Sequence, residues 1–162
     1  MAAGMSLQYS DVDEFRRRLN LECNLGEEDF VRKVVIDAVY KTGNITFEMP
    51  MELKSLEPFG KGNEKPVFAL SKASVERISI VGKNRNVLKL KLRDDSGIDV
   101  EGVMFNKTEE FTEFVKDKFG EEEFDKAYKG KNNEICVSCT FYPDINEYNG
   151  MKNIQIIVNN YC

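Results

Sequence analysis

The stretch VLKLKLRDDSGIDVEGVMF, residues 87–105, decides the fold of this chain. Leu88, Leu90 and Leu92 alternate with charged residues, which is the period-two pattern of a strand that has one face in the core. A second alternating run, IDVEGVMF, follows a short segment of Asp, Ser and Gly that is typical of a hairpin turn. The stretch therefore predicts two strands joined by a turn, with the charged side chains of the first strand facing solvent.

Further strands are expected on both sides of this hairpin. VFALSKASVERISIVG precedes it, and NEICVSCTFY and MKNIQIIVN follow it, around a turn expected at residues 144–150. Between these groups, residues 107–129 are expected to be helical, with Phe111, Phe114, Val115, Phe119 and Phe124 as the apolar members. Three strands, a helix and two strands is the order of a five-stranded OB barrel. We therefore predict a mainly β fold with α-helices, in which residues 67–162 form an OB-fold domain.

The part before the barrel has a different texture. Residues 57–66, EPFGKGNEKP, hold two of the four prolines and two glycines, so they are expected to be a connecting segment. In residues 1–56 we expect a helix capped by Ser10, a strand around residues 34–39, and a short helix within ITFEMPMELKSL. In that short helix, the side chains expected to face one way are Phe47, Met51, Leu53 and Leu56.

The composition bounds the class of protein. The 162 residues suit one full domain and a fragment of a second, and 41% hydrophobic and 31% charged residues are typical of a globular chain. No apolar run approaches the roughly 18 residues that span a bilayer, and no apolar leader follows the N-terminus. We expect a soluble, cytoplasmic protein with no membrane partner.

Several kinds of chemistry are disfavoured. The chain contains no histidine, which removes the commonest general base and transition-metal ligand. Cys136 and Cys139 lie in an expected strand, where positions three apart point to opposite faces and cannot share a metal. Asp94, Asp95 and Asp99 surround a Ser-Gly, so a solvated turn is a simpler interpretation than a cation site. We expect no catalytic residue and no metal in this chain.

A local basic surface points to nucleic acid. The net charge is −5, yet residues 65–105 carry eight Lys or Arg against five acids. OB-folds bind oligonucleotides across their second and third strands and between two loops, where aromatic side chains stack on bases. The candidate binding residues are Lys89, Lys91 and Arg93 on the expected second strand, Lys83 and Arg85 in the first loop, and Asn146, Tyr148, Asn149 and Lys152 in the second.

Two alternatives stay open for these residues. The three strand cations also fit the solvated face of a half-buried strand, with no ligand at all. In the second alternative, the barrel is a protein-interaction module with no direct nucleic-acid role, and its basic face is incidental. A free-standing metal nuclease that uses the three aspartates is the least favoured function, because no histidine or other base supports it.

Two segments resemble a known family. LEPFGKGNEKPVF, residues 56–68, is similar to the Leu-x-Pro-Phe-Gly-x-Gly-Asn-x-x-Pro-x-Phe signature of RecJ-type exonucleases, with all eight fixed residues in place. The opening MAAGMSL resembles the end of the Gly-Gly-His-x-x-Ala-Ala-Gly motif of the DHH-associated domain, through Ala2, Ala3 and Gly4. By this resemblance the chain begins inside that motif.

The resemblance implies a function as well as a fold. Residues 1–56 would be the C-terminal part of a DHH-associated domain, a partial α/β segment, joined by residues 57–66 to the OB domain. The chain would be the single-stranded-DNA-binding C-terminal region of a 5′–3′ exonuclease, a hydrolase of DNA repair and recombination, and inactive by itself. Mn²⁺ or Mg²⁺ is expected in a missing catalytic domain, other repair proteins are expected partners, and Gly4 is expected near the substrate. Residues 106–132 are longer and more acidic than the family leads us to expect.

Overall fold

The computed structural model describes residues 4–30 and 33–162, so Ala2 and Ala3 of the predicted motif lie outside the described residues. The chain divides into two compact units, Met1–Val34 and Val35–Cys162. The first unit holds the 3-10 helices η1 (Tyr9–Asp11) and η2 (Glu27–Phe30) and the helix α1 (Val12–Glu22). The predicted cap was wrong, because the Ser10 hydroxyl lies inside η1 and bonds to the Asp11 carboxylate, while α1 begins only at Val12.

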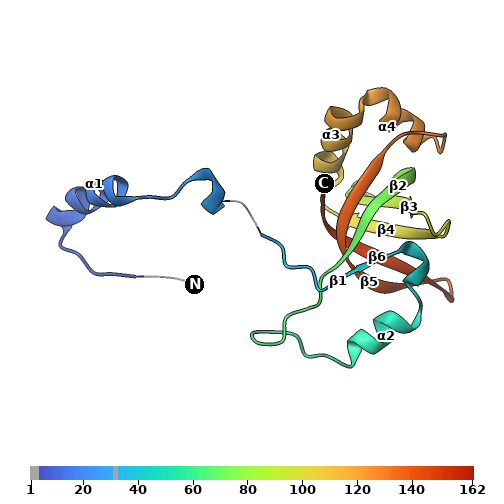
Figure 1. Cartoon of the computed structure of the whole chain (residues 1–162), viewed down its shortest axis with the longest axis horizontal. Helices are drawn as coiled ribbons and strands as arrows, with labels where there is room; N and C mark the ends of the chain where they lie inside the picture. Colours follow the sequence, from blue (N-terminus) through green and yellow to red (C-terminus); the bar gives the residue numbers. More distant parts are fainter. Residues whose placement is uncertain (1–3, 31–32) are drawn as a thin grey trace. The chain divides into compact units, whose positions relative to one another are not determined.

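The second unit contains the expected barrel. Its strands are β2 (Phe68–Val81), β3 (Val87–Arg93), β4 (Asp99–Phe105), β5 (Cys136–Tyr148) and β6 (Met151–Tyr161). β2 pairs with β3 through its second half and with β5 through its first, and a parallel pairing of β4 with β6 closes the ring (Figure 1). The five-stranded OB-like barrel and the order of its elements are confirmed.

One long strand serves both sides of the barrel because it bends. β2 has register shifts between Leu70 and Ala73 and between Val75 and Arg77, and Lys72 has a φ of 53° at the first of them. Such bulges increase the local twist and redirect a strand. As predicted, the alternating leucines of β3 point inward, with Leu88, Leu90 and Leu92 all at most 2% exposed.

The predicted helix between strands is two helices, α3 (Thr108–Phe119) and α4 (Glu121–Tyr128). They are separated at Gly120, whose φ of 95° ends α3 and is strained for any residue with a side chain. Phe111, Val115 and Phe124 are buried against the core, as their spacing predicted. Figure 1 shows α3 and α4 at one end of the barrel and the short helix α2 (Glu48–Lys54) at the other.

The segment before the connecting loop joins the barrel. β1 (Ala38–Tyr40) pairs in parallel with β2, a few residues later than the strand expected around residues 34–39, and η3 (Thr42–Asn44) follows it. Residues 35–56 therefore belong to the same compact unit as the barrel. The assignment of residues 1–56 to a different domain, the DHH-associated domain, stays a prediction.

The predicted apolar face of α2 was wrong in part. Met49 and Leu53 pack against the core, whereas Phe47, Met51 and Leu56 are all more than 40% exposed. Positions 49 and 53 lie one turn apart on one side of a helix that begins at Glu48, and position 51 lies on the opposite side.

The connecting loop is held by its own side chains. The Asn63 amide donates to the carbonyl oxygens of Leu56 and Pro58 at 2.8 and 3.0 Å, and the backbones of Gly60 and Asn63 form a bridge. The Phe59 ring meets the Tyr142 ring edge-on at 6.5 Å. Asn63 therefore holds the loop together, and Phe59 packs it against β5.

The last hairpin is longer than predicted. β5 runs to Tyr148, so most of the turn expected at residues 144–150 is strand, and only Asn149 and Gly150 form the turn. Their φ values of 50° and 76° suit the tight turns that match the twist of a hairpin. In the part of the chain that is described, no helix has the length and apolarity that a bilayer crossing requires.

Candidate nucleic-acid interface

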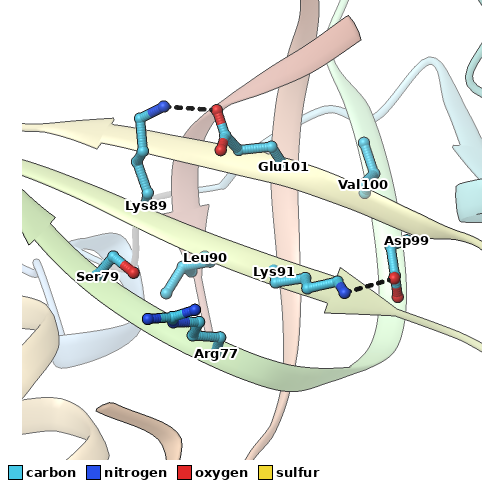
Figure 2. A pocket seen from close by; sticks show the side chains of 8 residues that line it. All are labelled: Arg77, Ser79, Lys89, Leu90, Lys91, Asp99, Val100 and Glu101. Carbon is cyan, nitrogen blue, oxygen red and sulfur yellow. Dashed lines mark hydrogen bonds and ion pairs between the residues drawn. The ribbon is translucent and has the colours of Figure 1, made fainter. Parts of the chain in front are cut away.

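Charged side chains gather on the solvent side of β2, β3 and β4. We call this surface the outer face; its members are Arg77, Ser79, Lys89, Lys91, Arg93, Asp99 and Glu101. Strand register brings them together, since Lys91 lies between Arg77 on β2 and Glu101 on β4. An open hollow of about 370 Å³ lies over most of these residues (Figure 2).

The three strand cations are paired with carboxylates. Lys89 Nζ lies 2.8 Å from Glu101 Oε1, Lys91 Nζ lies 2.8 Å from Asp99 Oδ2, and Arg93 Nε donates to Asp99 Oδ1 at 2.6 Å. The hydrogen bond from Arg93 is the main reason that the pKa of Asp99 is below its usual value. The sequence placed Lys89, Lys91 and Arg93 on the outer face correctly, but it missed the carboxylates that neutralise them.

Arg77 is a candidate that the sequence analysis missed. It is exposed, it lies beside Lys91 in the register of β2 and β3, and among the described residues no carboxylate is within ion-pair distance of it. The signal was present in SVERISIV, where Arg77 and Ser79 alternate with apolar residues at strand spacing.

One end of the outer face is bounded by the loop between β2 and β3. Lys83 and Arg85 are exposed there, and neither has an ion-pair partner among the described residues. Phe105 ends β4 directly opposite Val87, the first residue of β3 after this loop, and its aromatic ring is 52% exposed. Phe105 was also missed, because in the sequence it reads as the last apolar residue of a strand.

The β5–β6 hairpin holds the other predicted residues. Tyr148 is 69% exposed and pairs across the hairpin with Met151. Asn146 and Asn149 lie on the same hairpin, and Lys152 Nζ lies 3.5 Å from Glu147 Oε2. Gly4 belongs to the first unit and is exposed, and its assignment to the site stays a prediction.

Asp94 differs from a simple solvated turn residue. Its carboxylate accepts hydrogen bonds from the Thr42 backbone N–H and hydroxyl, both at 2.8 Å, and from the Ser96 N–H at 2.9 Å. Burial raises the pKa of Asp94, but the bonds from Ser96 and Thr42 outweigh it and lower the pKa to about 2. The predicted hairpin turn is therefore confirmed, but Asp94 is not simply solvated, because it ties the turn to η3.

The described residues offer little for metal chemistry. No three His, Cys, Asp or Glu side chains within them are arranged to hold a metal ion. Cys139 is buried, and desolvation raises the pKa of its thiol to about 12, while Cys136 is half-buried. Asp95 pairs instead with Lys41, at 2.7 Å.

Comparisons with known proteins agree on one family. A family model described as RecJ OB domain matches residues 36–160. The single-stranded-DNA-specific exonuclease RecJ of Bacillus subtilis (strain 168) is 38% identical over 111 residues, which cover 67% of this chain. The chain spans only 14% of the length of that relative.

Solved structures show the same fold. RecJ of Thermus thermophilus in complex with Mn²⁺ has a TM-score of 0.61 and 18% identity, with 97% of this chain and 20% of that chain covered. The complex of the same protein with Mg²⁺ gives 0.56 and 18%, with coverage of 96% and 21%. At this identity the likeness supports the architecture described above.

Proposed function

The chain belongs to the RecJ OB domain family, and from that premise we propose that it is the single-stranded-DNA-binding C-terminal region of a RecJ-like 5′–3′ exonuclease. The observation that carries the proposal is a set of exposed cations on β2 and in the loop that follows it, Arg77, Lys83 and Arg85, that have no ion-pair partner among the described residues. Two exposed aromatic rings, Phe105 and Tyr148, belong to the same barrel. Cations that track phosphates and rings that stack on bases bind single strands without reading their sequence.

In this proposal the barrel holds the strand and another domain cuts it. A RecJ-like enzyme of DNA repair and recombination would hold Mn²⁺ or Mg²⁺ in that other domain, act in the cytoplasm and meet other repair proteins there. This chain has no histidine, and its described carboxylates form no cluster of three. The chain alone is expected to release no nucleotides from single-stranded DNA with either ion. Divalent-dependent release by a clean preparation would show that it carries a cutting site of its own.

Binding is tested by fluorescence anisotropy of a labelled oligo-dT titrated with the whole chain at several salt concentrations. Three free cations give a log–log salt slope of about −2, at roughly −0.7 per phosphate contact. Replacing Lys83 and Arg85 with Gln removes two of these contacts, so the slope should flatten to about −0.7. A matched control, Lys118→Gln with Lys54→Gln, removes the same charge on α3 and α2 from exposed lysines that also have no ion-pair partner among the described residues, and it should keep the wild-type slope.

The alternative function has a different result in the same assay. A protein-interaction module predicts no saturable, salt-sensitive binding of oligo-dT by the wild type. Stacking is tested separately by Tyr148→Ala, which should weaken binding by about 1–3 kcal/mol and leave the slope unchanged, because stacking releases no ions. Tyr9→Ala is the control, since Tyr9 is 95% exposed and lies in the other unit.

A further inference from the structure

The ion pairs of the outer face form a ladder across β3 and β4. Asp99 and Glu101 make all the close contacts to the three cations, and each lysine reaches diagonally past the residue opposite it in the strand register. Lys89 lies opposite Val103 but pairs with Glu101, and Lys91 lies opposite Glu101 but pairs with Asp99 (Figure 2). The two carboxylates thus hold every cation of β3.

The carboxylates of this ladder can be displaced by another oxyanion, because the ion pairs are exposed. The side chains of Lys89 and Glu101 are 33% and 42% exposed, and those of Lys91 and Asp99 are 50% and 30% exposed. Exposed ion pairs of this kind are weakly held, because water competes for both partners. An oxyanion from outside can therefore reach the same N–H groups.

Carboxylate and phosphate oxygens compete for the same donors. Ammonium and guanidinium groups make short charge-assisted hydrogen bonds to both, and Arg93 already forms a two-bond contact to Asp99, at 2.6 and 3.0 Å. A second carboxylate, that of Glu76, lies farther from Arg93, at 3.9 Å. A phosphate that takes the place of Asp99 exchanges one oxyanion for another. The gain is small. The counterion that the strand releases at this contact is largely offset, because the freed carboxylate attracts a cation of its own.

We propose that Asp99 and Glu101 set the affinity of the outer face for a single strand, by occupying Lys89, Lys91 and Arg93 until a phosphate displaces them. This inference rests on the proposed function and deepens it. The contacts of the β3 cations to phosphate then add little to the salt slope, whereas Arg77, Lys83 and Arg85 each add the full amount for one phosphate contact. Six unpaired cations give a salt slope of about −4, and three give about −2, so the wild-type slope reports how many are free.

The test is the double variant Asp99→Asn with Glu101→Gln, in the same oligo-dT titration. Both substitutions keep the size of the side chain and remove its charge. The expected result is binding at least tenfold tighter in low salt and a slope that steepens from about −2 toward −4.

The control is Glu113→Gln with Asp117→Asn. Both acids lie on α3, both are exposed, and neither has an ion-pair partner among the described residues. The control removes the same two charges away from the outer face, so it tests whether net charge alone explains the gain. It should leave the slope at the wild-type value.

A second pair of variants isolates the displaced cations. Lys89→Gln with Lys91→Gln should hardly change the slope of the wild type, but it should remove most of the steepening in the Asp99→Asn, Glu101→Gln background. Melting temperatures of all variants establish that each is folded.

Two failures are distinguishable. If the Asp99→Asn, Glu101→Gln variant and the control have the same slope while the wild type binds, the competition is wrong and the binding function stands. If no variant and no wild type binds oligo-dT in a saturable, salt-sensitive way, the binding function itself is wrong, and the inference is overturned with it.

Discussion

Asp94 and Asp99 lie on either side of one short turn, yet their carboxylates meet very different partners. Asp94 accepts hydrogen bonds from the N–H and hydroxyl of Thr42, a residue 2% exposed, which fixes η3 to the barrel. Asp99 meets the long side chains of Lys91 and Arg93 on a surface open to water. The role of each carboxylate therefore follows from its partners: fixed, buried donors make Asp94 structural, and flexible, exposed cations make Asp99 exchangeable.

The largest effect on stability is expected at Asp94, whose partner Thr42 is buried. Thr42→Val keeps the shape of the side chain but removes the hydroxyl that contacts Asp94 and the Ile98 carbonyl. Removing a buried partner of a charged acceptor should cost about 2 kcal/mol of unfolding free energy, measured by urea denaturation. Thr112→Val is the control, since that hydroxyl bonds only to a carbonyl of its own helix. Equal losses of unfolding free energy for Thr42→Val and Thr112→Val would contradict the structural role given to the bond between Thr42 and Asp94.

A smaller effect is expected from acid. The folded-state pKa of Asp94 is about 2, below its usual value of 3.8, so its contribution to stability is present above pH 3.8 and is lost as the pH falls toward 2. That contribution is about 1–2 kcal/mol, allowing for solvent screening. The stability difference between the wild type and Asp94→Asn, from urea denaturation at a series of pH values, should shrink over this window. A difference that stays constant from pH 5 to pH 2 contradicts the assigned role.

The smallest effect on stability is expected at Asp99, on the exposed outer face. Asp99→Asn breaks the contacts to Lys91 and Arg93 but leaves no buried group without a partner. Its melting temperature should differ from the wild type by less than about 2 °C, because exposed ion pairs contribute little. A loss as large as that of Thr42→Val would mean that the outer face is structural and not exchangeable.

Much of the barrel was predictable because its signals are local. Leu88, Leu90 and Leu92 assign β3 without any knowledge of its neighbours, and the five-strand order follows from runs of the same kind. The positions of Asp99 and Glu101 were predictable too, since a hairpin turn at residues 94–97 places them opposite Arg93 and Lys91. The free charge of β3 therefore follows from the sequence only when the acids opposite its cations are counted as well.

Other features depend on contacts between distant segments. The hydrogen bond from Thr42 to Asp94 joins residues far apart in the chain, and no local pattern in residues 42–44 predicts it. The buried face of α2 is set by where the barrel lies, so Met49 and Leu53 could not be distinguished from Met51 by spacing alone. Phe105 is 52% exposed where β4 ends opposite Val87, although the sequence shows it only as the last residue of an apolar run.

The proposed binding surface is tested most directly by mapping where a single strand touches the protein. Amide chemical-shift changes of the whole ¹⁵N-labelled chain, titrated with oligo-dT at low salt, report this residue by residue. A strand bound to the outer face and the β5–β6 hairpin should give the largest changes in residues 77–91, 99–105 and 146–152, with little change in α3 and α4. Changes concentrated in α2 or in the helices α3 and α4, with the outer face unaffected, would contradict this binding surface.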